Sequence, residues 1–286
     1  MQTLQHYYAV LKPERTYANV MTAAAGLLLA SRWHINWALA AATIVGTTFV
    51  VMSACAANNA TDRNLDARMP RTRKRGLVVG AIPVRTVVIL SIVLGLAGFF
   101  ILAAYVNWLT VLLGVIGYID YVVLYAWSKR TTPYSTLIGT ISGAMPLAAG
   151  YTAVTNRFDT PALLLVLIMV AWQMVHFYAI GIYRHKDYEA GRLPIWPVRY
   201  GDVSTRNWMI AFTALFVVCS ALLAAPGPTH KIYLASMLII GAYWLYRAFQ
   251  GLKAPNLTQW AKKMFITSLW VLLATSALIS VSSVVA

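Results

Sequence analysis

The stretch NWALAAATIVGTTFVVMSACAA, residues 36–57, contains no charged side chain. An α-helix rises about 1.5 Å per residue, so about 20 apolar residues cross the hydrocarbon core of a bilayer. We therefore predict a transmembrane helix over this segment. Eight further apolar segments approach that length, which predicts an all-α membrane bundle of about nine transmembrane helices: 17–31, 86–104, 108–128, 136–155, 160–182, 207–225, 232–249 and 264–285.

The composition agrees with a polytopic membrane protein. Of the 286 residues, 60% are hydrophobic and 11% are charged, whereas a soluble domain carries about 25% charged residues. One helical bundle accounts for nearly the whole length, so we expect a single domain over residues 1–286. Residues 1–15 lack an apolar core followed by a small-residue cleavage site, so the first apolar segment is expected to stay in the mature protein.

The net charge of +15 is distributed unevenly along the chain. With the N-terminus in the cytoplasm, 20 of the 23 Lys and Arg residues fall on the cytoplasmic side, and only Arg32, Arg157 and Lys231 fall outside. This asymmetry follows the positive-inside rule. It predicts a protein of the plasma membrane whose N-terminus and large loops 58–85 and 183–206 are cytoplasmic, and it explains the charge without nucleic acid as a partner.

Asn58, Asp62 and Asp66 follow the second predicted span, 36–57, at intervals of four residues. Four residues of helix turn about 400°, so the three side chains share one stripe. Carboxylates at i and i+4 repel each other, and a divalent cation between them would reverse that repulsion. Carboxylate and amide oxygens suit Mg²⁺ bound through few protein groups and substrate phosphates. We interpret the stripe as a metal site, with a solvated acidic helix end as the alternative.

Positive charge follows this stripe directly. Cations beside a metal site suit a polyanionic ligand such as a diphosphate, although the positive-inside orientation accounts for part of them. The residues concerned are Arg71, Arg73, Lys74 and Arg75.

Asp187 lies in the second large loop, just after the sixth span, and is the natural partner of the first stripe. Two acidic sites facing each other across a bundle would hold Mg²⁺ on both sides of one diphosphate. The alternative is a solvated loop charge. Three cations flank this residue: Arg184, Lys186 and Arg192.

At these residues the sequence resembles the UbiA superfamily of intramembrane prenyltransferases, and within it the heme O synthase (protoheme IX farnesyltransferase) branch. That branch carries Asn-x-x-x-Asp-x-x-x-Asp followed by Met-x-Arg-Thr-x-x-Arg. The match here is Asn58, Asp62, Asp66, Met69, Arg71, Thr72 and Arg75. The likeness extends over most of the chain, through four further segments in the same order as in the branch: 11–31, 129–151, 172–188 and 193–201.

The sequence departs from the branch at a few positions. Val175 and Gly76 stand where proline is usual, and Leu11 stands where threonine often precedes Lys-Pro. Other branches carry a second Asp-x-x-x-Asp, but the residue four after Asp187 is Gly191. This departure favours heme over a quinone aromatic as the acceptor, and it leaves the second metal site with few ligands.

The resemblance implies a reaction and a set of site residues. Mg²⁺ held by Asn58, Asp62, Asp66 and Asp187 would bind the diphosphate of farnesyl diphosphate. The farnesyl cation would alkylate a vinyl group of protoheme IX, and water would supply the new hydroxyl of heme O. A heme A synthase or a terminal oxidase assembly is implied as the downstream partner. The polar residues implied around the diphosphate are Arg15, Asn19, Arg71, Arg75, Tyr125, Lys129 and Lys186.

Two residues within the predicted spans carry further hypotheses. His176 is the candidate heme ligand, because imidazole is a common axial ligand, and a hydrogen-bonded histidine inside the bundle is the alternative. Asp120 lies in the middle of the fourth span, where a carboxylate is costly and functional by default. It either lines the substrate cavity or stays protonated against a tyrosine such as Tyr118 or Tyr121.

Two other functions compete with heme prenylation. The first is a UbiA-type aromatic prenyltransferase of quinone biosynthesis, which the heme-like segments between Trp172 and Gly201 argue against. The second is a membrane transporter, which would place polar residues and broken helices at mid-depth. Apart from Asp120, the ionisable residues gather at one membrane face, as an enzyme that meets a charged head group requires.

Overall fold

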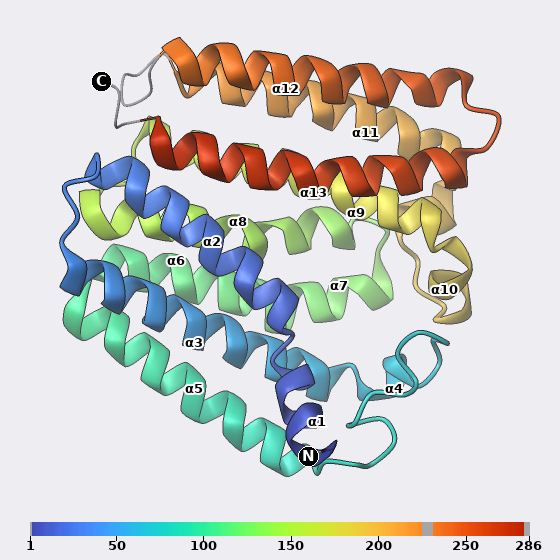
Figure 1. Ribbon diagram of the computed structural model, residues 1–286. Coiled ribbons are helices and arrows are strands. Elements are labelled where there is room, and N and C mark those ends of the chain that lie inside the picture. The colour runs from blue at the N-terminus through green and yellow to red at the C-terminus, as the bar shows by residue number, and fades with distance from the viewer. Residues whose placement is uncertain (1, 225–230, 283–286) are drawn as a thin grey trace.

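The computed structural model describes residues 2–224 and 231–282, and every regular element in these ranges is helical. Nine long helices form the bundle in Figure 1, which confirms the predicted fold class. They are α2 (Pro13–Ser31), α3 (Trp37–Thr61), α5 (Val84–Tyr105), the continuous helix α6–η1–α7 (Trp108–Ile119, Asp120–Leu124 and Tyr125–Thr131), α8 (Ser135–Thr155), α9 (Thr160–Tyr183), α11 (Trp196–Leu222), α12 (Lys231–Phe249) and α13 (Leu257–Val281). Short helices are α1 (Gln2–Val10), α4 (Arg63–Asp66), α10 (His185–Ala190) and η2 (Gln250–Lys253).

Eight of these long helices, α2 being the exception, are long and apolar enough to cross a membrane. The protein is therefore an integral membrane protein. Helix α2 begins at Pro13, earlier than the predicted span, and its first turns carry Glu14, Arg15 and Asn19. These polar turns lower the hydropathy of α2 because they reach the polar end of the bundle, as described below. Helix α11 also begins earlier than predicted, and Gly201 interrupts it with φ +81°.

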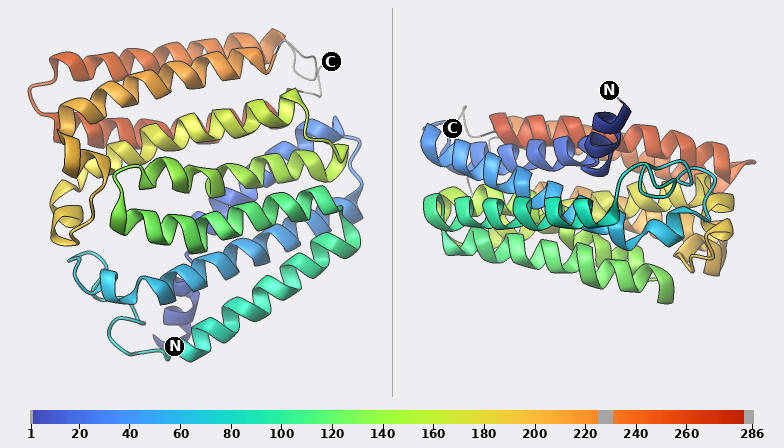
Figure 2. Two further views of the ribbon diagram at one scale, coloured as in Figure 1. Left: turned by 180° about the vertical axis from the view of Figure 1, so that it is seen from behind. Right: turned by 90° about the horizontal axis from the view of Figure 1, so that it is seen from below.

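The bundle is layered around α8 and α9. In Figure 2, helices α9, α8, α6–α7, α3 and α5 follow one another across one face, and α2 and α13 cross the other face in Figure 1. Helices α2 and α8 pack backbone to backbone. A Cβ on Gly26 would collide with the Leu147 carbonyl, and one on Gly150 would collide with the Ala23 carbonyl. Small residues at such crossings are what permit close helix packing in membranes.

The two large loops predicted from the sequence meet at one end of the bundle. Met69, in the loop after α4, forms a buried apolar cluster with Leu193 and Ile195, which follow α10. Gly191 packs against the same methionine, since a Cβ there would lie 3.1 Å from the Met69 side chain. The loops that follow α3 and α9 therefore pack against each other, which brings the first acidic stripe close to the loop that carries Asp187.

Candidate active site

The acidic stripe lies where α3 passes into α4. Asp62 lies between α3 and α4 as the C-cap of α3, Asp66 is the last residue of α4, and the backbone continues the helical pattern between them. The Asp62 N–H donates to the Asn58 carbonyl at 3.0 Å, and the Asp66 N–H donates to the Asp62 carbonyl at 2.8 Å. Asn58, Asp62 and Asp66 are only 2%, 7% and 4% exposed. The shared stripe predicted from the spacing is confirmed, and the alternative of a solvated acidic helix end is wrong.

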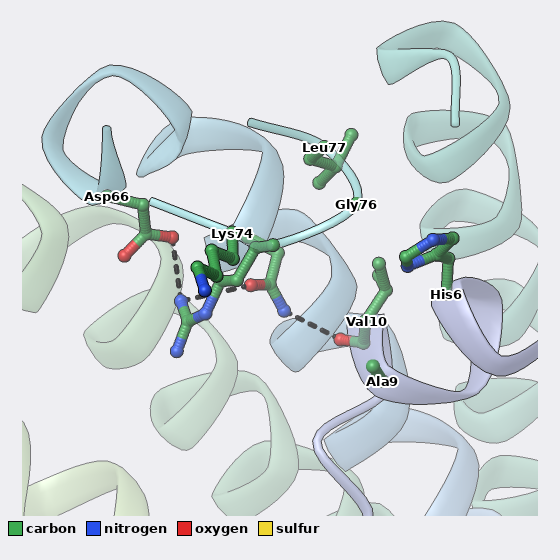
Figure 3. Close-up of a pocket in the computed structure, with 9 residues that line it drawn as sticks. His6, Ala9, Val10, Asp66, Lys74, Gly76 and Leu77 are labelled. Carbon is green, nitrogen blue, oxygen red and sulfur yellow. Dashed lines mark hydrogen bonds and ion pairs between the residues drawn. The ribbon is translucent and has the colours of Figure 1, made fainter. Parts of the chain in front are cut away.

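Every side chain of the stripe contacts a cation. Lys129 forms an ion pair with Asp62, and Arg130 Nη2 lies 3.2 Å from the other oxygen of that carboxylate. Arg75 Nη1 lies 2.6 Å from Asp66 Oδ2, the ion pair drawn beside Asp66 in Figure 3. The predicted residues Lys129 and Arg75 therefore lie at the stripe. Arg130 was not among the predicted site residues, although it lies in segment 129–151, one of those that carry the resemblance.

A second ladder from η1 and α7 faces the first. The rings of Tyr121 and Tyr125 stack with centroids 5.8 Å apart and planes inclined by 7°. The Tyr121 hydroxyl donates to Asn58 Oδ1 at 3.3 Å. Lys129 Nζ lies 5.1 Å from the centroid of the Tyr125 ring. Tyr125 and Lys129 thus occupy the site as expected, and Tyr121 joins them one turn earlier.

Lys12 and Arg15 approach the same tyrosine from the start of α2. Lys12 Nζ donates to Asn58 Oδ1 at 2.7 Å and to the Tyr121 hydroxyl at 3.3 Å, and Arg15 Nη1 donates to that hydroxyl at 2.9 Å. Burial, and then repulsion from Arg15, lowers the pKa of Lys12 to about 7. Within the described ranges, neither cation forms an ion pair with a carboxylate. Two cations without a carboxylate partner favour an anionic ligand.

Lys12 was not among the predicted site residues, and the backbone explains why. It adopts a left-handed conformation, with φ +48°, immediately before Pro13 at the start of α2. This conformation costs a non-glycine residue about 1–2 kcal/mol and tends to persist at functional sites. Asn59 holds the junction by donating from Nδ2 to the Val10 carbonyl at 2.7 Å, a bond drawn in Figure 3. The Lys-Pro pair was the one sequence signal that could have indicated this residue.

The second loop reaches the site through Tyr188 more closely than through Asp187. Tyr188 interacts electrostatically with Arg71, Arg15 and Arg184, and burial raises its pKa. Asp187 Oδ2 lies 3.6 Å from Arg184 Nη1 and is partly exposed. Among the described residues, no three His, Cys, Asp or Glu side chains lie close enough to share a metal ion. The role of Asp187 as a metal ligand stays a prediction.

Two other predicted residues contribute less to the site. Lys186 is exposed on α10. Asn19 donates from Nδ2 to the Arg15 carbonyl within its own helix at 2.9 Å.

The chemistry of the donor set fits Mg²⁺. Asn58, Asp62 and Asp66 present hard oxygen atoms, and Mg²⁺ needs only one or two carboxylates when water and phosphate oxygens complete its shell. Asn58 Nδ2 is buried and has no hydrogen-bond partner in the described part of the chain. An unsatisfied buried donor beside these oxygens suits a phosphate oxygen, because burying it without a partner costs about 1–3 kcal/mol.

His176 lies between α9 and α13 in an aromatic setting. Its Nδ1 is 2.8 Å from Ser268 Oγ, and its ring stacks on Trp172 with centroids 4.8 Å apart. The hydrogen-bonded histidine of the alternative hypothesis is thus present. The Ser268 contact leaves Nε2 as the ring nitrogen for an axial bond, so heme ligation stays a prediction.

Of the two hypotheses for Asp120, the pairing with Tyr118 or Tyr121 is wrong, and a place in the substrate cavity stays a prediction. Asp120 Oδ2 accepts the backbone N–H of Ser142 in α8 at 2.9 Å. Consecutive helical residues point about 100° apart, so Tyr121 turns away from Asp120 and toward the stripe. The Tyr118 hydroxyl instead lies 3.4 Å from Ser53 Oγ.

Comparison with known proteins places these observations in context. Residues 19–270 match the model of the UbiA prenyltransferase family. A protein of Pseudomonas savastanoi pv. phaseolicola named protoheme IX farnesyltransferase is 40% identical over 280 residues, covering 98% of this chain and 95% of the relative. A Pseudomonas fluorescens protein named protoheme IX farnesyltransferase 2 is 40% identical over 279 residues, covering 97% and 95%.

Solved structures share the fold. A UbiA homolog from Aeropyrum pernix K1 superposes with a TM-score of 0.72 at 23% identity, covering 94% of this chain and 98% of that one. A UbiA homolog from Archaeoglobus fulgidus bound to DMAPP and Mg²⁺ gives a TM-score of 0.69 at 15% identity, covering 96% and 99%. A digeranylgeranylglyceryl phosphate synthase gives 0.84 at 18% identity with full coverage of both chains.

Proposed function

Because the chain belongs to the UbiA prenyltransferase family and is a prenyltransferase, we propose that it transfers the farnesyl group of farnesyl diphosphate to protoheme IX. The product is heme O, and Mg²⁺ is the cofactor. The observation that carries the proposal is the convergence of Lys12 and Arg15 on the buried stripe, since neither pairs with a carboxylate among the described residues. The named relatives support protoheme as the acceptor, in place of a quinone aromatic.

In this proposal the diphosphate is bound by the positive charge of the metal ion and of several Lys and Arg side chains. Asn58, Asp62 and Asp66 would hold Mg²⁺, and Asp187 would approach it from the second loop. When bound, Mg²⁺ supplies positive charge that stabilises the departing diphosphate. The cations then donate charge-assisted hydrogen bonds to phosphate oxygens, which are stronger than bonds between neutral groups. These cations are Lys12, Arg15, Arg71, Arg75, Lys129, Arg130 and, at the edge, Lys186.

The transfer step breaks the allylic C–O bond of the prenyl diphosphate and forms a C–C bond to the terminal carbon of a heme vinyl group. Water adds its oxygen to the other vinyl carbon and loses one proton, and the diphosphate leaves with its bonding electron pair. The apolar spans around the prenyl chain exclude the excess water that would quench the allylic cation. His176 Nε2 is the proposed axial contact to the iron.

The polar end of the bundle is assigned to the cytoplasm of a cell whose plasma membrane holds the protein. Most Lys and Arg residues lie in loops at this end, which supports the orientation. The chain acts as a single catalytic domain, and its product passes to a heme A synthase or a terminal oxidase assembly.

The test is the mass of the product formed by the purified full-length protein. Protoheme, farnesyl diphosphate and Mg²⁺ are supplied in one reaction, and 4-hydroxybenzoate replaces protoheme in a second. We expect protoheme to gain one farnesyl group and one hydroxyl, and the aromatic acid to stay unmodified. Prenylation of the aromatic acid with unchanged protoheme would overturn the proposal in favour of quinone biosynthesis.

A further inference from the structure

Asp120 is a buried carboxyl group that the proposed chemistry does not use. It is 1% exposed and lies in the middle of the helix that runs from Trp108 to Thr131. Oδ2 accepts the Ser142 N–H, and Oδ1 has no hydrogen-bond partner in the described part of the chain. A polar group at this depth is costly unless it serves a purpose. Among the described residues, Ser142 of α8 is the hydrogen-bond partner of this carboxyl group.

The helix changes its winding at Asp120. Residues Asp120–Leu124 form a π-helical turn, in which the Tyr125 N–H bonds to the Asp120 carbonyl five residues earlier. Such a turn accommodates one extra residue within an α-helix and is frequent at functional sites. Residues after the turn are rotated by about 100° relative to an uninterrupted helix. The π turn therefore decides which face of α7 carries Tyr125 and Lys129.

The rotation allows the first half of this helix to contact α8 while Lys129 in the second half contacts Asp62. Before the π turn, Thr110 bonds to Thr152 of α8, and a Cβ on Gly117 would lie 3.2 Å from Met145. After the turn, Lys129 must face Asp62 on α3. Without the extra residue, a helix packed on α8 through Thr110 and Gly117 would direct Lys129 away from Asp62.

Helix α8 is adapted to receive Asp120. Pro146 lies inside α8 and has no N–H to bond the Ser142 carbonyl four residues earlier. Its ring also crowds that carbonyl, which loosens the helix at this turn. The Ser142 N–H in the same turn bonds to the Asp120 side chain across the interface. The irregular turn of each helix thus meets that of the other at the contact between Asp120 and Ser142.

We propose that Asp120 is a positioning residue for prenyl transfer: its bond to the Ser142 N–H fixes the π turn, and the π turn holds Tyr125 and Lys129 opposite Asp62. The proposal rests on the proposed function, because it assigns Lys129 to the diphosphate. The acceptor site at His176 does not enter it. Removing the bond therefore impairs the binding and the reaction of the prenyl diphosphate and leaves protoheme binding unchanged.

The test compares three variants of the full-length protein in lipid nanodiscs. Asp120→Ala removes the acceptor. Asp120→Asn keeps an oxygen that accepts the Ser142 N–H. Thr110→Val is the matched control, because it removes a buried hydrogen bond between the same two helices near their other ends. For each variant we measure kcat relative to the concentration of folded protein, the KM of both substrates and the melting temperature.

We expect Asp120→Ala to lower kcat by about tenfold to 100-fold and to raise the KM of farnesyl diphosphate, because small displacements of catalytic groups cost on the order of 100-fold. The KM of protoheme stays constant. Asp120→Asn restores both parameters to near those of the unmodified protein, and Thr110→Val changes only the melting temperature. The proposal is overturned if Asp120→Ala has the kinetics of Thr110→Val, or if Asp120→Asn is as impaired as Asp120→Ala.

A parallel Asp62→Ala variant separates this proposal from the proposed function. If Asp62→Ala loses activity while Asp120→Ala keeps normal kinetics, only the positioning role fails. If Asp62→Ala keeps full activity, the diphosphate site itself is wrong.

Discussion

Lys129 and Asp62 form an ion pair between α7 and the end of α3, with side chains 6% and 10% exposed. The pair joins the tyrosine ladder to the acidic stripe. A buried pair costs desolvation energy, and removing one partner leaves the other uncompensated. Because prenyl diphosphate brings new negative charge, we propose that Lys129 exchanges its carboxylate partner for a phosphate oxygen.

Substituting Lys129 tests this exchange. We expect Lys129→Met to destabilise the protein by about 3 kcal/mol, because it leaves a buried carboxylate with a partly exposed partner. Activity falls further than stability alone explains, since a phosphate contact is also lost. Arg130→Met is the matched control. Its pair with Asp62 is more exposed, so a loss of about 0–1 kcal/mol is expected. Equal losses of stability from the two variants, measured by denaturation, would contradict the exchange.

Lys12→Met tests a cation that pairs with no carboxylate in residues 2–224 and 231–282. We expect the KM of farnesyl diphosphate to rise about tenfold or more, since a charge-assisted bond contributes roughly 1.5–3 kcal/mol. Stability stays the same or improves, because no ion pair is broken. Lys74→Met is the control, as Lys74 is an exposed cation in the basic run after the stripe. An unchanged KM in Lys12→Met would remove this lysine from the diphosphate site.

His176→Ala tests the proposed axial contact to heme. We expect the Soret band of bound protoheme to shift, because the iron loses an imidazole ligand. Ser268→Ala keeps the imidazole but removes the 2.8 Å contact at Nδ1, so it weakens heme binding with a smaller spectral change. The measurement is an absorption titration of each variant with protoheme. An unchanged Soret band in His176→Ala leaves only the structural role.

Gly150→Val tests the contact between α2 and α8. We expect a loss of about 1–3 kcal/mol or more, because the added side chain must push apart two backbones that touch. Gly95→Ala is the control, since its Cβ would meet only the Ser53 side chain. Thermal unfolding in the same detergent compares the two. Equal stability would show that the helices can separate at little cost.

The sequence predicted the membrane bundle and the acidic stripe because both follow from spacing. Apolar length predicts spans, and a four-residue interval predicts a shared helical face. It could not predict Lys12 or Tyr121, because their contacts join residues 46 to 109 positions apart. Lys12 also depends on a left-handed backbone before Pro13.

The partner of Asp120 was equally hidden from the sequence. The Asp120 carboxyl group accepts a hydrogen bond from the backbone N–H of Ser142 in α8. Every residue except proline has such an N–H, so no residue type in the sequence indicates this partner. The π turn shifts the register of the helix without a marker residue. The sequence therefore left two hypotheses open for Asp120, a place in the substrate cavity or a contact with Tyr118 or Tyr121.

We propose that the Asn58–Asp62–Asp66 stripe binds the metal and the diphosphate. The rate of heme O formation by Asp62→Ala at saturating Mg²⁺ tests it most directly. Asp159→Ala, which alters a carboxylate at the start of α9, is the control for folding. We predict that Asp62→Ala loses at least about 100-fold in rate while Asp159→Ala keeps most of its activity. Heme O formation by Asp62→Ala at a rate close to that of the unmodified protein would contradict the account.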